Sequence, residues 1–125
     1  MSACIGFWGR DDIVLREILN MFHCSPDHQI GLQPNGKIYH ARIELFDKRK
    51  ADPEFVIKKC IELVSGIELV SGDDWKKISN YISGGIESWI TVQLYDKDFV
   101  QINISLEEMR WLVGIGIEFT IENHA

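Results

Sequence analysis

Long hydrophobic runs are missing from this 125-residue chain. Its apolar stretches are only a few residues long, whereas a membrane-spanning helix needs about 20 such residues. The first residues reach Arg10 and Asp11 without the apolar stretch of a secretory signal peptide. The sequence therefore predicts a soluble protein with no membrane association, and we expect a cytoplasmic location.

Cysteine is also scarce. Cys4, Cys24 and Cys60 are odd in number and widely spaced, which does not predict a disulfide framework. His23, Cys24 and His28 form the one close group of metal-ligand residue types. A structural zinc site usually takes four ligands in two close pairs, and no second pair is present. We therefore expect reduced thiols, no bound metal and no cofactor.

Sequence motifs for catalysis and nucleotide binding are missing as well. The glycines form neither a G-x-G-x-x-G pattern nor a Walker loop. Paired carboxylates do occur, but each pair lies at an expected helix start or turn, where acids complement the helix dipole or accept backbone N–H groups. These pairs are Asp11/Asp12, Asp73/Asp74, Asp96/Asp98 and Glu107/Glu108. The sequence therefore predicts that the protein is not an enzyme.

Positive charge is scarce in the second half of the chain. Residues 1–60 carry nine Lys and Arg against eight Asp and Glu, a balance of +1. Residues 61–125 carry four against eleven, a balance of −7, which with the first half gives the net charge of −6. Such asymmetry favours a basic partner and disfavours nucleic acid or an anionic membrane surface.

Hydrophobic periodicity and cap residues predict one α+β domain over residues 1–125, with a mainly antiparallel sheet of about six strands and helices packed on one face. Helices are expected at 11–22, 52–65, 73–83 and 105–114, and strands at 4–8, 30–32, 37–46, 86–95, 99–104 and 117–122. Ile61–Gly66 is repeated as Ile67–Gly72, and we interpret the second copy as a connector or short strand.

The clearest strand is Ile86–Tyr95. The short turn Asp96–Asp98 after it predicts a hairpin with Phe99–Ile104 as the central strand pair. Alternation places one set of its side chains in the core, namely Ile86, Ser88, Ile90, Val92 and Leu94. The other set faces the opposite way, namely Glu87, Trp89, Thr91, Gln93 and Tyr95.

The helix expected at 105–114 begins with a capping box, Ser105-Leu106-Glu107-Glu108. Its predicted packing residues are Leu106, Met109, Leu112 and Val113. The final strand alternates Ile117, Phe119 and Ile121 with Glu118, Thr120 and Glu122.

Aromatic residues among acids on the solvent side of a sheet are typical of a protein interface. Trp89 and Tyr95 are the candidate anchors; the alternative is that a helix or loop covers this face, or that Trp89 is merely half-buried. Glu118 and Glu122 would extend the face if the two strands are neighbours. The predicted partner-binding residues are Glu87, Trp89, Tyr95, Asp96, Asp98, Glu118 and Glu122.

Two stretches of the chain form a familiar pattern. They are Gly9–Asp12 with Cys24–Pro26 and Gly31, and Ile104–Glu108 with Leu112, Gly116 and Ile117–Ile121. Together they resemble a family of small bacterial domains of unknown function. Some members of that family look like immunity proteins of contact-dependent growth inhibition and other polymorphic toxin systems. The resemblance implies an antitoxin-like protein and carries over no catalytic residues.

Charge and resemblance together predict an immunity protein that binds a cognate basic toxin domain, with a nuclease among the candidates. Its acids would stand in for substrate phosphates and block the toxin's active site. One alternative is a small-ligand or regulatory binding domain with a pocket between sheet and helices. Another is an enzyme that uses Cys24 and a histidine.

Overall fold

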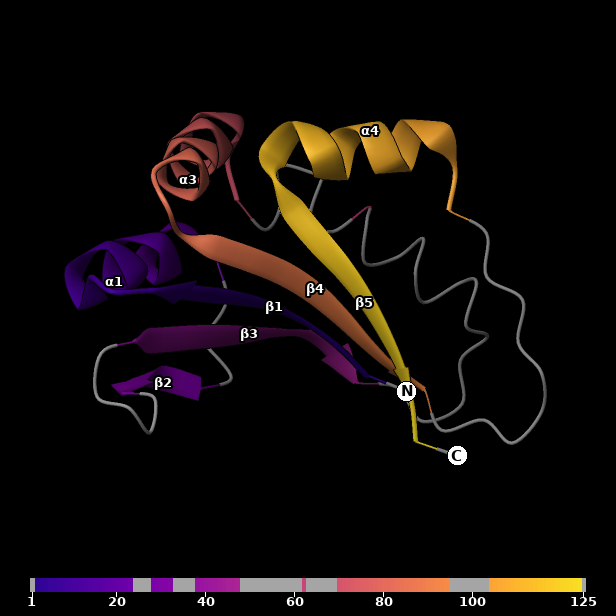
Figure 1. The fold of residues 1–125 in the computed structure, drawn as a ribbon, viewed down its shortest axis with the longest axis horizontal. Coiled ribbons are helices and arrows are strands. Elements are labelled where there is room, and N and C mark those ends of the chain that lie inside the picture. The colour runs from indigo at the N-terminus through magenta and orange to yellow at the C-terminus, as the bar shows by residue number, and fades with distance from the viewer. Residues whose placement is uncertain are drawn as a thin grey trace.

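The backbone of this protein, seen in a computed structural model, forms a mixed sheet with helices on one side (Figure 1). The structure describes residues 2–23, 28–32, 38–47, 62, 70–94 and 104–124. In chain order, its elements are β1 (Ser2–Gly9), α1 (Asp12–Met21), β2 (His28–Leu32), β3 (Tyr39–Asp47), α3 (Gly72–Ser83), β4 (Glu87–Leu94), α4 (Leu106–Ile115) and β5 (Ile117–Asn123). The predicted α+β class is confirmed.

The strand order across the sheet is β2-β3-β1-β4-β5, so the first strand of the chain lies at the centre. The pairings β2–β3, β3–β1 and β1–β4 are antiparallel, whereas β4–β5 is parallel. Five of the six predicted strands are present in the described part of the chain. The sixth, 99–104, and the predicted helix at 52–65 lie almost entirely outside it.

The predicted central hairpin is wrong. Along one edge, β4 pairs with β1 from Trp8↔Glu87 to Ser2↔Gln93, and along the other it pairs with β5 from Ser88↔Ile117 to Leu94↔Asn123. A strand has only two hydrogen-bonding edges, so β4 has none left for residues 99–104. Alternation shows that a segment is a strand but does not specify its partner.

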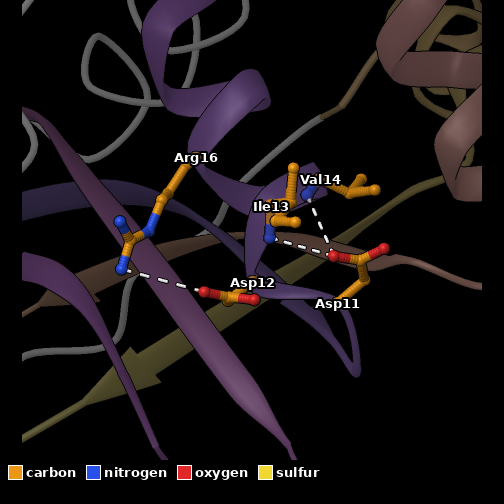
Figure 2. A network of polar contacts seen from close by, with 5 residues as sticks. All are labelled: Asp11, Asp12, Ile13, Val14 and Arg16. Carbon is orange, nitrogen blue, oxygen red and sulfur yellow. Dashed lines mark hydrogen bonds and ion pairs between the residues drawn. The ribbon is translucent and has the colours of Figure 1, made fainter.

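Helix α1 begins where the sequence predicts, because Asp11 is an N-cap. Its Oδ1 accepts hydrogen bonds from the backbone N–H groups of Ile13 at 2.9 Å and Val14 at 3.4 Å (Figure 2). The next residue, Asp12, forms an ion pair with Arg16, which lies one helical turn later: its Oδ2 atom is 3.7 Å from the Nη2 atom of Arg16. An N-cap of this kind satisfies backbone donors that the helix itself leaves unpaired.

Helices α3 and α4 both begin with a serine cap. The Oγ of Ser71 accepts from the backbone N–H of Asp74 at 3.2 Å, and that of Ser105 from the backbone N–H of Glu108 at 3.1 Å. The sequence predicts the second cap but assigns the first to Asp73 and Asp74, which instead lie in the first turn of α3. There the acids complement the helix dipole rather than cap the helix.

The core lies between the sheet and the three described helices. Ile5 and Phe7 of β1 and Ile90 of β4 are fully buried beneath them. A chain of edge-to-face aromatic contacts at 5.9 Å between ring centroids continues through the helices, from Phe7 to Phe22, to Trp75 and to Trp111. The predicted arrangement, with helices packed on one face, is confirmed for the described elements (Figure 1).

Helix α4 packs through a different face from the predicted one. Leu112 is buried as expected, but Leu106, Met109 and Val113 are 69%, 42% and 79% exposed. Trp111, which the sequence interpretation left out, packs on the core through Trp75. Because α4 carries apolar residues on several sides, periodicity alone does not choose which side faces the sheet.

Candidate functional site on the outer face of the sheet

The sheet face opposite the described helices, here called the outer face, carries most of the polar residues of the described strands together with two tryptophans. Strand alternation and register place these side chains together on it. They are Trp8 of β1; His40, Arg42 and Glu44 of β3; Glu87, Trp89, Thr91 and Gln93 of β4; and Glu118, Thr120 and Glu122 of β5.

The predicted alternation of β4 is confirmed. Ile90 and Val92 are completely buried on the helix side, whereas Glu87 on the outer face is exposed and Trp89 is half-buried. Thr91 differs from its outer-face neighbours because only 8% of its surface is exposed. The outer face is therefore accessible around Glu87 and Trp89 but closed at Thr91.

Trp89 has an aromatic partner that sequence reasoning missed. The ring centroids of Trp8 and Trp89 lie 5.5 Å apart, and His40 lies 5.6 Å from Trp8 on its other side. The ring of Trp89 lies over Gly6, where a Cβ atom would come within 2.6 Å of its Cε2 atom. Alternation in β1, with Ile5 and Phe7 inward, was a signal that Trp8 lies on the other face, but only the pairing of β1 with β4 places it beside Trp89.

Glutamates lie directly across from both tryptophans. Trp8 is the register partner of Glu87 on β4, and Trp89 is the register partner of Glu118 on β5. The condition that the sequence left open is met: β4 and β5 are neighbours, so Glu118 and Glu122 extend the same face. All three glutamates are exposed, and Glu122 lies 3.3 Å from the ring of His124.

The β3 side of the outer face carries His40, Arg42 and Glu44. On β3, His40 is the register partner of Trp8, and Arg42 is the register partner of Gly6. Glu87, Glu118 and Glu122 lie on β4 and β5, at the opposite side of β1. A ligand on this face therefore meets mainly carboxylates on one side of Trp8, and on the other side a mixture of an imidazole, a guanidinium and the carboxylate of Glu44.

A cleft of about 640 Å³ lies beside the outer face, where β1 and β4 meet the turns leading to α1 and from α3. Its lining includes Trp8 and Glu87, which also belong to the outer face, together with Asp11 and Tyr81. The Tyr81 hydroxyl donates a 2.5 Å hydrogen bond to the carboxylate of Glu17. This hydrogen bond, with desolvation and the charge of Glu17, raises the pKa of Tyr81.

Other predicted residues fall outside the described part of the chain. Among the partner-binding candidates these are Tyr95, Asp96 and Asp98, and Cys24 lies outside it as well; His28 is described through its backbone, as the first residue of β2. Within the described residues, no group of three or more His, Cys, Asp or Glu side chains could hold a metal ion. None of the described helices is long and apolar enough to cross a membrane.

Comparison with known proteins found no matching protein family, no matching curated protein and no matching solved structure. The resemblance to the small bacterial domains stays a prediction.

Proposed function

We propose that this protein is a binding module for a basic protein domain and that the outer face is its binding surface. The observation that carries the proposal is the tryptophan pair, Trp8 and Trp89, with the exposed glutamates Glu87 and Glu118 directly across from it and Glu122 further along the same face. Half-buried tryptophans combine apolar area with a polar N–H group, which suits a protein interface.

The two kinds of residue would contribute differently to binding. Exposed glutamates attract a basic partner over about 8 Å at physiological salt and chiefly raise the association rate. The tryptophans lose contact with water only in the complex, so they chiefly lower the dissociation rate. The complex should therefore form more slowly as salt increases, while its lifetime changes less.

We propose further that the basic partner is a toxin domain and that the protein acts as its immunity protein. The support is the −7 charge balance of residues 61–125 and the resemblance of the segments around Gly9–Asp12 and Ile104–Glu108 to immunity-like domains. Carboxylates can occupy a basic catalytic cleft in place of substrate phosphates, as in a nuclease. Inhibition would then require no chemistry by this chain.

The test is binding to the product of the adjacent gene, with association and dissociation rates measured at low and physiological salt. We expect a stable complex whose association rate falls as salt increases, and loss of the partner's toxicity when the two are mixed. Absence of binding would contradict the immunity proposal. Binding with a salt-independent association rate would contradict the electrostatic mechanism.

The cleft beside the outer face favours a second candidate, binding of a small ligand. Its volume of about 640 Å³ lies within the range of small-molecule sites, and it combines the aromatic wall of Trp8 with polar groups of Asp11 and Tyr81. A small ligand bound there should raise the melting temperature, and Trp8→Ala should remove that rise. A rise that persists in Trp8→Ala would place the ligand elsewhere.

A further inference from the structure

Two Trp–Glu pairs repeat on the outer face. Trp8 lies across from Glu87 on the neighbouring strand, and Trp89 lies across from Glu118. Directly opposed residues on neighbouring strands have Cβ atoms about 5 Å apart, so Glu87 and Glu118 begin next to the two tryptophans. From its position on β4, the ring of Trp89 extends over Gly6, toward β1. The outer face therefore carries the same combination, a tryptophan across from a glutamate, at two neighbouring places.

Each pair has the chemistry of a guanidinium site. The face of an indole ring attracts a cation through its quadrupole, and tryptophan is the strongest aromatic residue in this respect. Arginine is planar, so it can stack on the ring while its N–H groups donate to a carboxylate. Glu87 and Glu118 are exposed and the two tryptophans half-buried, so both sites are open to a side chain arriving from solvent.

The two sites have a defined spacing. Glu87 and Trp89 are two residues apart on β4, so Trp8, opposite Glu87, is a diagonal neighbour of Trp89. The ring centroids of Trp8 and Trp89 lie 5.5 Å apart. In an extended chain, residues i and i+2 point the same way and are separated by about 6.6 Å, since each residue advances about 3.3 Å. The two distances nearly match.

We propose that the outer face binds an extended segment of the partner that carries two arginines separated by one residue. One guanidinium stacks on Trp8 beside Glu87 and the other on Trp89 beside Glu118. The tryptophans and the glutamates across from them belong to β1, β4 and β5, so the segment lies over these three strands. This inference rests on the proposed function and specifies the partner segment.

Two peptides of identical composition test the spacing: acetyl-Gly-Arg-Gly-Arg-Gly-amide, and its isomer acetyl-Gly-Arg-Arg-Gly-Gly-amide, whose adjacent arginines point to opposite sides when extended. Binding is followed through the indole N–H signals of ¹⁵N-labelled protein, assigned with single Trp→Phe variants. Trp8 and Trp89 report on the outer face, and Trp75 and Trp111, on the helix side, are internal controls.

We expect the spaced peptide to shift the signals of Trp8 and Trp89 only, and to bind about threefold more tightly than its isomer, as one additional exposed cation–π contact implies. Trp8→Ala should remove this preference, because a single ring remains, and Glu87→Gln with Glu118→Gln should weaken the binding of both peptides. Glu107→Gln on α4 should do neither. Equal affinity of the two peptides, or equal shifts at Trp75 and Trp111, would overturn the inference.

The peptide result is separable from the proposed function. If the basic partner binds with salt-dependent association and the peptides bind equally, the spacing inference is wrong and the binding module stands. If the partner also fails to bind, the proposed function is wrong with it.

Discussion

At the scale of single residues, the outer face depends on Gly6. The ring of Trp89 occupies the space that a side chain at this position would need, and the backbone φ of Gly6 is not left-handed. The missing Cβ atom is therefore required for close packing rather than for backbone conformation. A glycine inside a strand commonly marks such a close approach.

Gly6→Ala should therefore displace Trp89 and lower the free energy of unfolding by about 1–3 kcal/mol, the usual cost of overpacking. Chemical denaturation measures the loss, and the indole signal of Trp89 reports the displacement. Gly114→Ala is the matched control, because nothing lies within 4 Å of a Cβ atom there and alanine favours a helix. An unchanged Trp89 signal in Gly6→Ala would contradict this packing.

Tyr81 links α3 to α1 through Glu17, and its raised pKa predicts the pH dependence of that link. A pKa raised in the folded state means that the hydrogen bond contributes fully below the unfolded-state value, about 10, and is lost as pH rises through the folded-state value. The stability difference between wild type and Tyr81→Phe should thus be constant from pH 7 to 9 and shrink above 10. Urea unfolding at these pH values measures it. If the stability difference between wild type and Tyr81→Phe already shrank between pH 7 and 9, this would contradict a raised pKa of Tyr81.

At the scale of elements, the sequence specifies local structure better than packing partners. The alternation of β4 and β5 predicts which residues share a face, and Asp11 and Ser105 predict two helix starts, because these signals lie within a few residues. The β4 hairpin prediction fails because the partners of β4 are β1 and β5, and the pairing with β1 joins distant segments of the chain. Trp8 is missed as a site residue for the same reason.

Adjacent residues of α4 test the corrected orientation of this helix. Leu112 is buried and Val113 is 79% exposed. Leu112→Ala should lower the free energy of unfolding by about 2–4 kcal/mol through loss of packing and cavity formation. Val113→Ala should change it by less than about 0.5 kcal/mol, as for an exposed position. Equal losses in the two variants, measured by chemical denaturation, would indicate that α4 packs as the sequence pattern first predicts.

At the scale of the whole molecule, the fold concentrates charge that is dispersed in the sequence. Parallel pairing of β4 with β5 places Glu118 and Glu122 next to Trp89 and Gln93. Antiparallel pairing of β4 with β1 then adds Trp8 beside Glu87. The acidic balance of the second half of the chain thereby contributes to one accessible surface, and the central claim is that this surface binds the partner.

The most direct test compares two double charge reversals, Glu118→Lys/Glu122→Lys on the outer face and Asp73→Lys/Glu107→Lys at the starts of α3 and α4. Both double variants change the net charge of the protein by the same amount. If net charge alone controlled association with the adjacent gene product, the two variants would therefore associate at the same reduced rate. We predict that at low salt the outer-face variant associates at least about tenfold more slowly than the control variant, because steering is strongest close to the binding surface. Equal association rates for the two variants would contradict the assignment of the outer face as the binding surface.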